Sequence, residues 1–255
     1  MNKRLAGRVA IVTGSGHGIG KAYALRLAAE GAKAVVADID GDGAAAVCAE
    51  LRAAGNDAIA VATDVATAAG TGEMARRAIE AFGRIDILVN NAAMFSRVPM
   101  SRIPFDEITE DEWDRLMSVN VRGMWLACRA VVPHMKERGY GKIVNIGSST
   151  VWERTGTRIH YVTSKAAVVG FTRTLATELG KFNIGVNCIA PGSTLSEEEP
   201  TDAVIAMRTG ATAARAFKRV QRPEDLAGAV AFFASPDSDF ITGQTLVVDG
   251  GAVMR

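Results

Sequence analysis

The chain has 255 residues, of which 48% are hydrophobic and 22% are charged, and its formal net charge at pH 7 is +1. This length and composition are typical of one large α/β domain with a substantial core. No block of like charge indicates a nucleic-acid or membrane-surface partner, and no apolar run approaches the ~20 residues that a membrane-spanning helix needs.

The cysteines and the start of the chain bear on the compartment. Cys48, Cys128 and Cys188 are odd in number and widely spaced, so we expect buried thiols in a reducing compartment, the cytoplasm, and no disulfide framework. Arg8 and the turn after Thr13 interrupt the first apolar stretch too early for a secretory signal peptide. The three histidines form no metal-ligand pattern, and we expect no metal: His17, His134 and His160.

Short apolar runs alternate with longer segments of helical periodicity along the whole chain. The predicted strands are Val9–Thr13, Ala34–Asp38, Ala58–Thr63, Ile87–Asn90, Ile143–Ile146, Gly185–Ile189 and Thr245–Val248. The predicted helices include Ile19–Glu30, Gly43–Ala54, Ala69–Phe82, one that a capping box begins at Thr109, and one that begins at Pro223. Strands that are apolar throughout are typical of a parallel sheet covered on both faces. We therefore predict a single domain over residues 1–255, with a doubly wound parallel sheet of about seven strands flanked by helices.

A glycine-rich turn follows the first predicted strand. It reads Thr13-Gly-Ser-Gly-His-Gly-Ile-Gly20, and a helix follows it. Glycines permit a tight turn and close approach of the backbone to a pyrophosphate, and the helix N-terminus supplies N–H donors. The strand before and the helix after give the motif its required context. The sequence therefore predicts a Rossmann-type dinucleotide site here.

An acidic residue ends the second predicted strand. Asp38 lies 18 residues beyond Gly20, where a carboxylate can accept hydrogen bonds from the ribose hydroxyls of the adenosine. The same charge would repel a 2′-phosphate, and neither Ile39 nor His17 supplies a fixed cation to offset it. We therefore expect NAD(H) rather than NADP(H).

Tyr161 and Lys165 lie four residues apart in a segment of helical periodicity, so their side chains share one helix face. A phenol ionises near pH 10, and a neighbouring cation favours the phenolate. The pair is thus suited to acid–base chemistry on a hydroxyl or carbonyl. By itself it is a weak motif, which roughly one chain in ten of this composition would contain by chance.

The segment after the sixth predicted strand departs from the alternation. It is turn-rich and acidic from Pro191 to Pro200, and alanine-rich with helical character from Thr201 to Lys218. It could be a solvated surface excursion, but its place after a sheet strand favours a lid over a substrate pocket. We assign the lid to residues 193–218.

These features together resemble the short-chain dehydrogenase/reductase family over essentially the whole chain. The family's glycine motif matches Thr13 to Gly20, and its Tyr-x-x-x-Lys is complete. Its Asn-Asn-Ala-Gly reads Asn-Asn-Ala-Ala at positions 90–93, which puts a methyl group in place of the last glycine. Further matches are Asp64-Val65, Asn120, Ser148, Asn187-x-x-x-Pro191-Gly192 and Val248-Asp-Gly-Gly251. Ser149 competes for the serine position, but the 13 residues from Ser148 to Tyr161 favour Ser148.

The resemblance implies reversible hydride transfer between NAD(H) and a secondary alcohol or ketone. Tyr161 is then the general acid/base, Ser148 holds the substrate oxygen, and Lys165 lowers the pKa of the tyrosine and binds the nicotinamide ribose. Asn120 positions a water that links Lys165 to solvent. The cofactor residues implied are Gly14, Ser15, His17, Gly18, Ile19, Gly20, Asp38, Ile39, Asp64, Val65, Asn91, Ala92, Ala93, Tyr161, Lys165, Pro191, Gly192 and Thr194.

Two stretches are most similar to secondary-alcohol dehydrogenases of the 1-phenylethanol dehydrogenase type. They are Ser149–Glu153 with His160-Tyr161, and Phe171–Gly180 with Asp239–Gln244. We expect an apolar, aromatic-lined substrate pocket, to which a bulky charged substrate would be foreign. The pocket residues expected are Met94, Phe95, Ser148, Trp152, His160 and Tyr161. Phe95 and Trp152 could equally be core or interface aromatics, and His160 points away from Tyr161 on an ideal helix, which favours a structural role.

Two other functions remain open. A 3-oxoacyl thioester (acyl-carrier-protein) reductase would usually use NADPH in this family, which Asp38 disfavours. A non-catalytic NAD-binding regulator would tend to lose the serine, tyrosine or lysine, and all three are present. The resemblance also implies a homotetramer, in which the helices Thr109–Lys136 and Tyr161–Lys181 pack across one interface.

Overall fold

A computed structural model describes residues 3–95 and 100–254, and seven parallel strands form one sheet in it. The strands are β1 (Val9–Thr13), β2 (Lys33–Asp38), β3 (Ala58–Ala62), β4 (Ile87–Asn90), β5 (Gly141–Ile146), β6 (Ile184–Pro191) and β7 (Thr245–Val248). Their order is β3-β2-β1-β4-β5-β6-β7, so the chain reverses direction across the sheet between β3 and β4. This arrangement confirms the predicted doubly wound Rossmann-type sheet.

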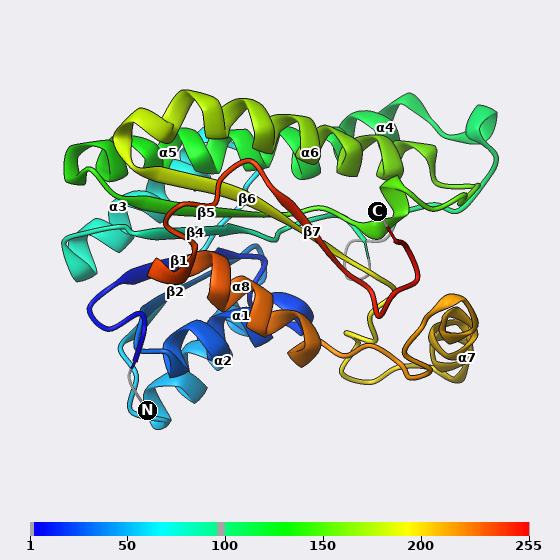
Figure 1. Ribbon diagram of the computed structural model, residues 1–255, viewed down its shortest axis with the longest axis horizontal. Helices are drawn as coiled ribbons and strands as arrows, with labels where there is room; N and C mark the ends of the chain where they lie inside the picture. Colours follow the sequence, from blue (N-terminus) through cyan, green and yellow to red (C-terminus); the bar gives the residue numbers. More distant parts are fainter. Residues whose placement is uncertain (1–2, 96–99, 255) are drawn as a thin grey trace.

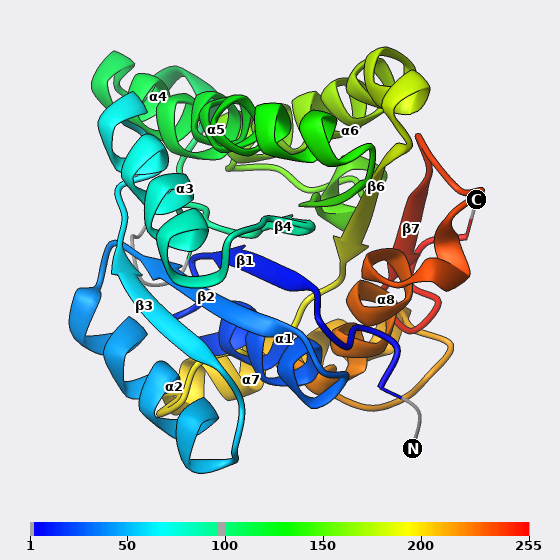
Figure 2. The ribbon, with the colours of Figure 1, turned by 90° about the vertical axis from the view of Figure 1, so that its left-hand side faces the viewer.

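Helices cover both faces of the sheet (Figures 1 and 2). They are α1 (Gly18–Ala29), α2 (Gly41–Ala53), α3 (Ala68–Phe82), α4 (Glu110–Met117), α5 (Gly123–Arg138), α6 (Ile159–Leu179), α7 (Asp202–Gly210) and α8 (Glu224–Ala234). One hydrophobic layer packs the sheet against α1, α2 and α8, and a second packs it against α3, α5 and α6. None of the helices in the described ranges is long and apolar enough to cross a membrane.

The predicted strands and helices are present, with boundaries that differ by up to two residues. Two helical segments differ more. The helix predicted from Thr109 to Lys136 is divided into α4 and α5 by a π-helical turn, Ser118–Arg122. The segment Thr201–Lys218 is helical only through α7 and the short 3-10 turn Ala211–Ala214, after which Arg215 is extended. In Figure 1, α7 lies beyond the carboxyl ends of the strands.

The capping box predicted at Thr109 is half formed. The Thr109 hydroxyl accepts a hydrogen bond from the Glu112 backbone N–H at 3.2 Å, as a helix N-cap does. The Glu112 carboxylate does not turn back to the cap; it accepts from the Ser101 N–H at 2.6 Å and contacts His160 at 3.0 Å. This carboxylate therefore joins α4 to the loop that follows β4 and to the start of α6.

A buried chain of polar side chains fixes α6 on the sheet. The Asn90 amide donates to Asn145 Oδ1 at 2.9 Å, and Asn145 Nδ2 donates to Thr172 Oγ1 at 2.9 Å. The Thr172 hydroxyl donates in turn to the Val168 carbonyl at 2.8 Å. Because these groups are buried, each lost partner leaves a desolvated polar atom unpaired. The network therefore ties the helix that bears Tyr161 and Lys165 to β4 and β5.

We predict that Thr172→Val destabilises the fold by about 1–3 kcal/mol, because the Asn145 amide loses its buried acceptor. The matched control is Thr177→Val on the exposed face of the same helix, whose hydroxyl makes the same type of backbone contact, to the Arg173 carbonyl at 3.2 Å. That change should alter the free energy of unfolding by less than about 0.5 kcal/mol. Urea unfolding at one fixed protein concentration checks both, and equal midpoints for the two variants would contradict the role of the network.

Candidate active site

The glycine turn between β1 and α1 is shaped so that side chains cannot enter it. Gly14 has a positive φ of 63°, and a Cβ there would lie 2.8 Å from Ala92 Cα. A Cβ on Gly20 would lie 2.0 Å from the Gly14 carbonyl oxygen. The helix begins after His17, whose side chain makes no capping hydrogen bond. The first N–H groups of α1 therefore remain available to a ligand that approaches the bare backbone.

Side chains from two other strands hold this turn in place. Asp38 Oδ2 accepts from the Gly16 N–H at 2.8 Å, and Oδ1 accepts from the Asp40 N–H at 3.0 Å. Asn91 Nδ2 donates to the carbonyls of Thr13 at 3.0 Å and of Gly14 at 2.8 Å. The ends of β1, β2 and β4 are thus joined into one rigid edge. The carboxylate of Asp38 keeps lone pairs for further donors.

The remaining residues expected at the cofactor fall into two groups. Several side chains form hydrogen bonds with nearby backbone groups. The Ser15 hydroxyl donates to the Val12 carbonyl at 2.6 Å, and Asp64 Oδ1 accepts from the Ala66 N–H at 2.9 Å. Thr194 is buried and donates to the Gly192 carbonyl at 3.0 Å. Others remain half-buried or exposed, and Ile39 has an exposed fraction of 67%. The half-buried residues along this edge are His17, Gly18, Ile19, Ala92, Ala93 and Gly192.

Ser148, Tyr161 and Lys165 meet at the carboxyl end of β5. Ser148 hydrogen-bonds the Tyr161 phenol, and its oxygen also accepts from the Thr150 hydroxyl at 2.8 Å. Lys165 Nζ donates to the Ile146 carbonyl at 2.9 Å and lies 5.8 Å from the centre of the Tyr161 ring. All three side chains are buried. The structure brings together the three residues that the spacing of the sequence singled out.

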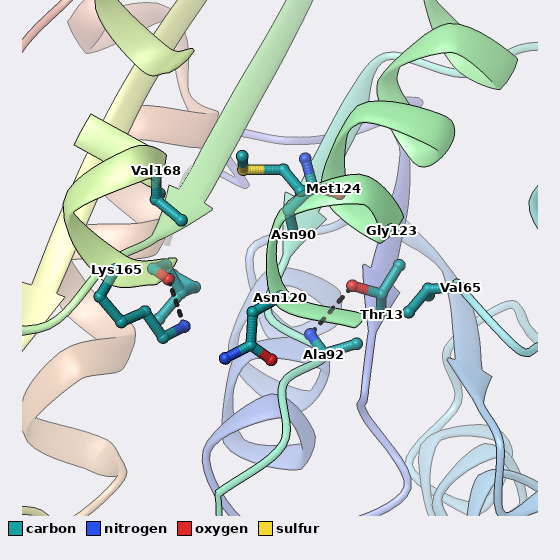
Figure 3. Close-up of a pocket in the computed structure, with 10 residues that line it drawn as sticks. Thr13, Val65, Asn90, Ala92, Asn120, Gly123, Met124, Lys165 and Val168 are labelled. Carbon is teal, nitrogen blue, oxygen red and sulfur yellow. Dashed lines mark hydrogen bonds between the residues drawn. The ribbon is translucent and has the colours of Figure 1, made fainter. Parts of the chain in front are cut away.

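Asn120 lies in the π-helical turn between α4 and α5. Its Oδ1 accepts from the Met94 N–H at 2.8 Å, and its Nδ2 donates to the Ser164 hydroxyl at 3.1 Å. Asn120 and Lys165 line one small cavity together with Thr13, Ala92 and neighbouring residues (Figure 3). The cavity has room for about one water molecule. A π-helical turn often marks a functional site, because it re-aims one side chain within a helix.

Burial is the largest influence on the pKa values of Tyr161 and Lys165. Burial raises the pKa of Tyr161 above its ordinary value, against a hydrogen bond from Ser148 and the positive charges of Arg158 and Arg208, which lower it. Burial also lowers the pKa of Lys165 to about 8. The sequence analysis expected Lys165 to lower the tyrosine pKa; in the structure the leading cations that lower it are Arg158 and Arg208.

The residues expected at the substrate pocket are only partly together. Met94 packs against Tyr161, and the Phe95 ring lies 5.2 Å from the Tyr161 ring, centre to centre. His160 is fully buried and directs Nε2 to Glu112 at 3.0 Å, which favours the structural reading of this residue. Trp152 is half-buried in the loop that precedes α6.

Sequence reasoning did not single out the arginines beside Tyr161. Arg158 lies at the N-cap of α6, three residues before the tyrosine, and Arg208 lies in α7. The position of Arg158 at the start of the helix was a local signal that could have identified it. No local pattern marks Arg208, because its contact with the site depends on how α7 folds back.

Segment 193–200 lies against the glycine turn. A Cβ on Gly18 would lie 3.0 Å from the Ser196 carbonyl oxygen, and His17 Nδ1 lies 3.8 Å from a Glu198 carboxylate oxygen. Arg208 Nη2 donates to Glu197 at 2.8 Å. The connection after β6 therefore spans from the glycine turn to α7.

Comparisons with known proteins show the family to which the chain belongs. A family model described as enoyl-(acyl carrier protein) reductase matches residues 14–253. The chain is 40% identical over 251 residues to a subunit of (2S)-[(R)-hydroxy(phenyl)methyl]succinyl-CoA dehydrogenase from Thauera aromatica, covering 96% of each chain.

Solved structures of similar proteins cover the whole chain as well. A 7α-hydroxysteroid dehydrogenase complexed with NADH and 7-oxo glycochenodeoxycholic acid has a TM-score of 0.90 and 34% identity, covering 100% of this chain and 97% of that one. A 3-ketoacyl-(acyl-carrier-protein) reductase from Brucella melitensis complexed with NADH has a TM-score of 0.88 and 34% identity, covering 98% and 100%. The chain belongs to the short-chain dehydrogenase/reductase family of oxidoreductases.

Proposed function

We propose that the protein interconverts a secondary alcohol and a ketone with NAD(H), using Tyr161 as general acid/base. The observation that carries the proposal is the buried meeting of Ser148, Tyr161 and Lys165 at the sheet edge that also bears the glycine turn. NAD supplies a hydride acceptor, and NADH a hydride donor, at nicotinamide C4. The protein's part is to hold the carbinol and to move its hydroxyl proton.

The residues present fit a dinucleotide. The glycine turn is packed so tightly that a Cβ on Gly14 or Gly20 would strike backbone atoms, which keeps side chains out of the turn, and the uncapped start of α1 supports binding of a pyrophosphate. Asp38 is suited to the adenosine ribose hydroxyls, with Lys165 at the nicotinamide ribose. We keep the remaining cofactor assignments made from the sequence, and treat Ser15 and Asn91 as residues that hold the turn.

We propose NAD(H) rather than NADP(H). The Asp38 carboxylate is fixed by two backbone N–H groups, so it cannot swing away from a 2′-phosphate without losing both bonds. Asp40 lies nearby and engages His17 at 2.7 Å, which adds negative charge to the same corner. Like charges held this close disfavour a phosphate.

In the proposed mechanism, Ser148 donates to the substrate oxygen and orients the hydroxyl toward Tyr161. Tyr161 takes the hydroxyl proton in oxidation and returns it in reduction. Lys165 and Asn120 line a cavity that suits one water, which would carry the proton onward. Because burial raises the pKa of the free tyrosine, Ser148 and the neighbouring cations have to stabilise the phenolate for oxidation.

We further propose a secondary alcohol dehydrogenase of the 1-phenylethanol dehydrogenase type, with Met94 and Phe95 against the substrate. The hydroxy(phenyl)methyl group in the name of the Thauera relative supports an aryl carbinol. Segment 193–218 is the proposed lid of a single domain, supported by its contacts with the glycine turn. We also propose a homotetramer, which the exposed Trp125 on α5 supports. A cytoplasmic location is proposed as well, and the three free buried cysteines support it.

The second candidate is a 3-oxoacyl thioester reductase, which similarity to a 3-oxoacyl-[acyl-carrier-protein] reductase from Synechocystis and to the Brucella 3-ketoacyl reductase favours. The Brucella reductase is complexed with NADH, so a preference for NADH would not exclude a 3-oxoacyl thioester reductase. Absorbance at the NADH band, followed with secondary alcohols, steroids, sugars and acyl thioesters, separates the two. A non-catalytic regulator would give no absorbance change with any of them.

We predict that Tyr161→Phe lowers turnover by about 10²–10⁴-fold, because the proton acceptor is lost. NADH binding, measured by fluorescence titration, should remain nearly unchanged. The matched control is Tyr23→Phe, which removes the same atom from a buried tyrosine whose hydroxyl has no partner among the described residues. Turnover retained in Tyr161→Phe would remove Tyr161 from the mechanism.

We predict that kcat/KM for NAD exceeds that for NADP, and that Asp38→Asn narrows this ratio by about tenfold or more, because a charge-assisted contact is lost and a repulsion is relieved. Asp42→Asn, on the exposed first turn of α2, should leave the ratio unchanged. Steady-state kinetics with both cofactors measure it. A wild-type kcat/KM for NADP that equals or exceeds the value for NAD would overturn the assignment.

We predict that Lys165 costs stability at neutral pH. Its pKa of about 8 in the folded protein lies below the ordinary 10.5, so the unfolded chain binds more protons between these values. Stability relative to Lys165→Met should therefore rise with pH from about 8 to 10.5, by about 3 kcal/mol, and stay constant below that window. Unfolding curves of both proteins across this range check the sign. A difference that does not vary with pH would contradict the burial of a charged lysine.

A further inference from the structure

Three arginines from distant parts of the chain gather beside Tyr161. Arg102 belongs to the loop after β4, Arg158 to the N-cap of α6, and Arg208 to α7. Arg102 Nη1 lies 3.4 Å from the Met207 sulfur, next to Arg208 in the chain. The Arg208 guanidinium lies 5.7 Å from the centre of the Phe95 ring, and that ring contacts Tyr161.

Much of the hydrogen-bonding capacity of these guanidinium groups is unused. Arg208 is only 4% exposed; it donates to Glu197 at 2.8 Å and to the Ser193 hydroxyl at 3.2 Å. Its buried Nε has no partner within residues 3–95 and 100–254. Arg158 is half-buried and makes no hydrogen bond or ion pair to any residue in those ranges. Arg102 makes only the contact with Met207 there.

The cluster carries more positive charge than its surroundings balance. Among the described residues, Glu197 is the carboxylate that forms an ion pair with the cluster, through Arg208. Glu153 also acts on Tyr161, but it accepts a hydrogen bond from Ser149, and Glu112 is engaged by Ser101 and His160. Burial, and then the charges of Arg158 and Arg208, lower the pKa of Arg102. Like charges in a partly desolvated space repel one another, and an anion between them would offset that cost.

We propose that the substrate carries a carboxylate near its reacting carbon, and that Arg102, Arg158 and Arg208 bind it. This inference rests on the proposed function, because it specifies which secondary alcohols the same site accepts. The aromatic part of the expected pocket is present in Phe95, but the arginines make the pocket amphipathic rather than apolar. Planar guanidinium groups suit a carboxylate, which each can bind through two parallel hydrogen bonds.

The test compares one substrate with and without its charge. The probes are 3-hydroxy-3-phenylpropanoate and its methyl ester, each oxidised with NAD. Wild-type kcat/KM should be at least about tenfold higher for the acid, and this preference should fall as salt is added. Arg158→Gln and Arg102→Gln should each reduce the acid-to-ester ratio by about tenfold, mainly through KM for the acid.

The ratio is the proper readout because Arg158 also acts on the pKa of Tyr161. A change in that pKa alters both probes alike and leaves the ratio intact, whereas loss of an anion site alters only the acid. Arg154→Gln is the matched control: this exposed arginine lies in the same loop and makes no hydrogen bond or ion pair to the described residues. It should leave both rates unchanged.

A binding measurement separates this inference from the proposed function. Calorimetry with 3-phenylpropanoate and 3-phenylpropanamide, neither of which can be oxidised at a carbinol, should show at least tenfold tighter binding of the acid to wild type and no preference in Arg158→Gln. Carboxylate preference without turnover of any alcohol would leave the inference standing and sink the proposed function. The inference would be overturned, and the proposed function spared, if the wild type oxidised the acid and the ester with equal kcat/KM. The same conclusion would follow if Arg158→Gln lowered kcat/KM by the same factor for the acid and for the ester.

Discussion

The hydrogen bond from Lys165 Nζ to the Ile146 carbonyl joins α6 to the carboxyl end of β5, and the geometry of the proposed site depends on it. It holds the lysine under the tyrosine ring on one side and beside the Asn120 cavity on the other. The hydrogen bonds that link Asn90, Asn145 and Thr172 fix the same helix to β4 and β5. A helix that slid along the sheet would break both sets of buried bonds at once, so the proton-transfer residues are held rigidly.

The parallel sheet explains why cofactor and proton chemistry adjoin. Every strand ends at the same edge, so the turn after β1, the carboxylate after β2, the amide after β4 and the serine after β5 come together without further design. Asp38 and Asn91 then stiffen the glycine turn through backbone contacts. Binding and catalysis would thus draw on one preorganised edge, with α7 and its Arg208 covering the outer side.

Much of this could be predicted from the sequence because the signals are local. Uniformly apolar strands, the glycine turn and the Tyr161–Lys165 spacing depend on residues that are near one another in the chain, and the structure agrees with each. The π-helical turn at Asn120 could not be predicted, since helical periodicity does not reveal one extra residue per turn. The partner of Glu112 and the gathering of Arg102, Arg158 and Arg208 depend on contacts between segments far apart in the chain. Such contacts leave no periodic pattern.

The central claim is that the protein transfers a hydride from a carbinol carbon to NAD while Tyr161 takes the hydroxyl proton. Transfer of deuterium tests it most directly: the protein is mixed with NAD and a secondary alcohol deuterated at the carbinol carbon, and the reduced cofactor is examined by NMR. We predict deuterium at nicotinamide C4 on one face only, with a slower rate than for the undeuterated alcohol when the chemical step limits turnover. Binding of NAD without any reduced cofactor, across neutral and carboxylate-bearing alcohols, would contradict it.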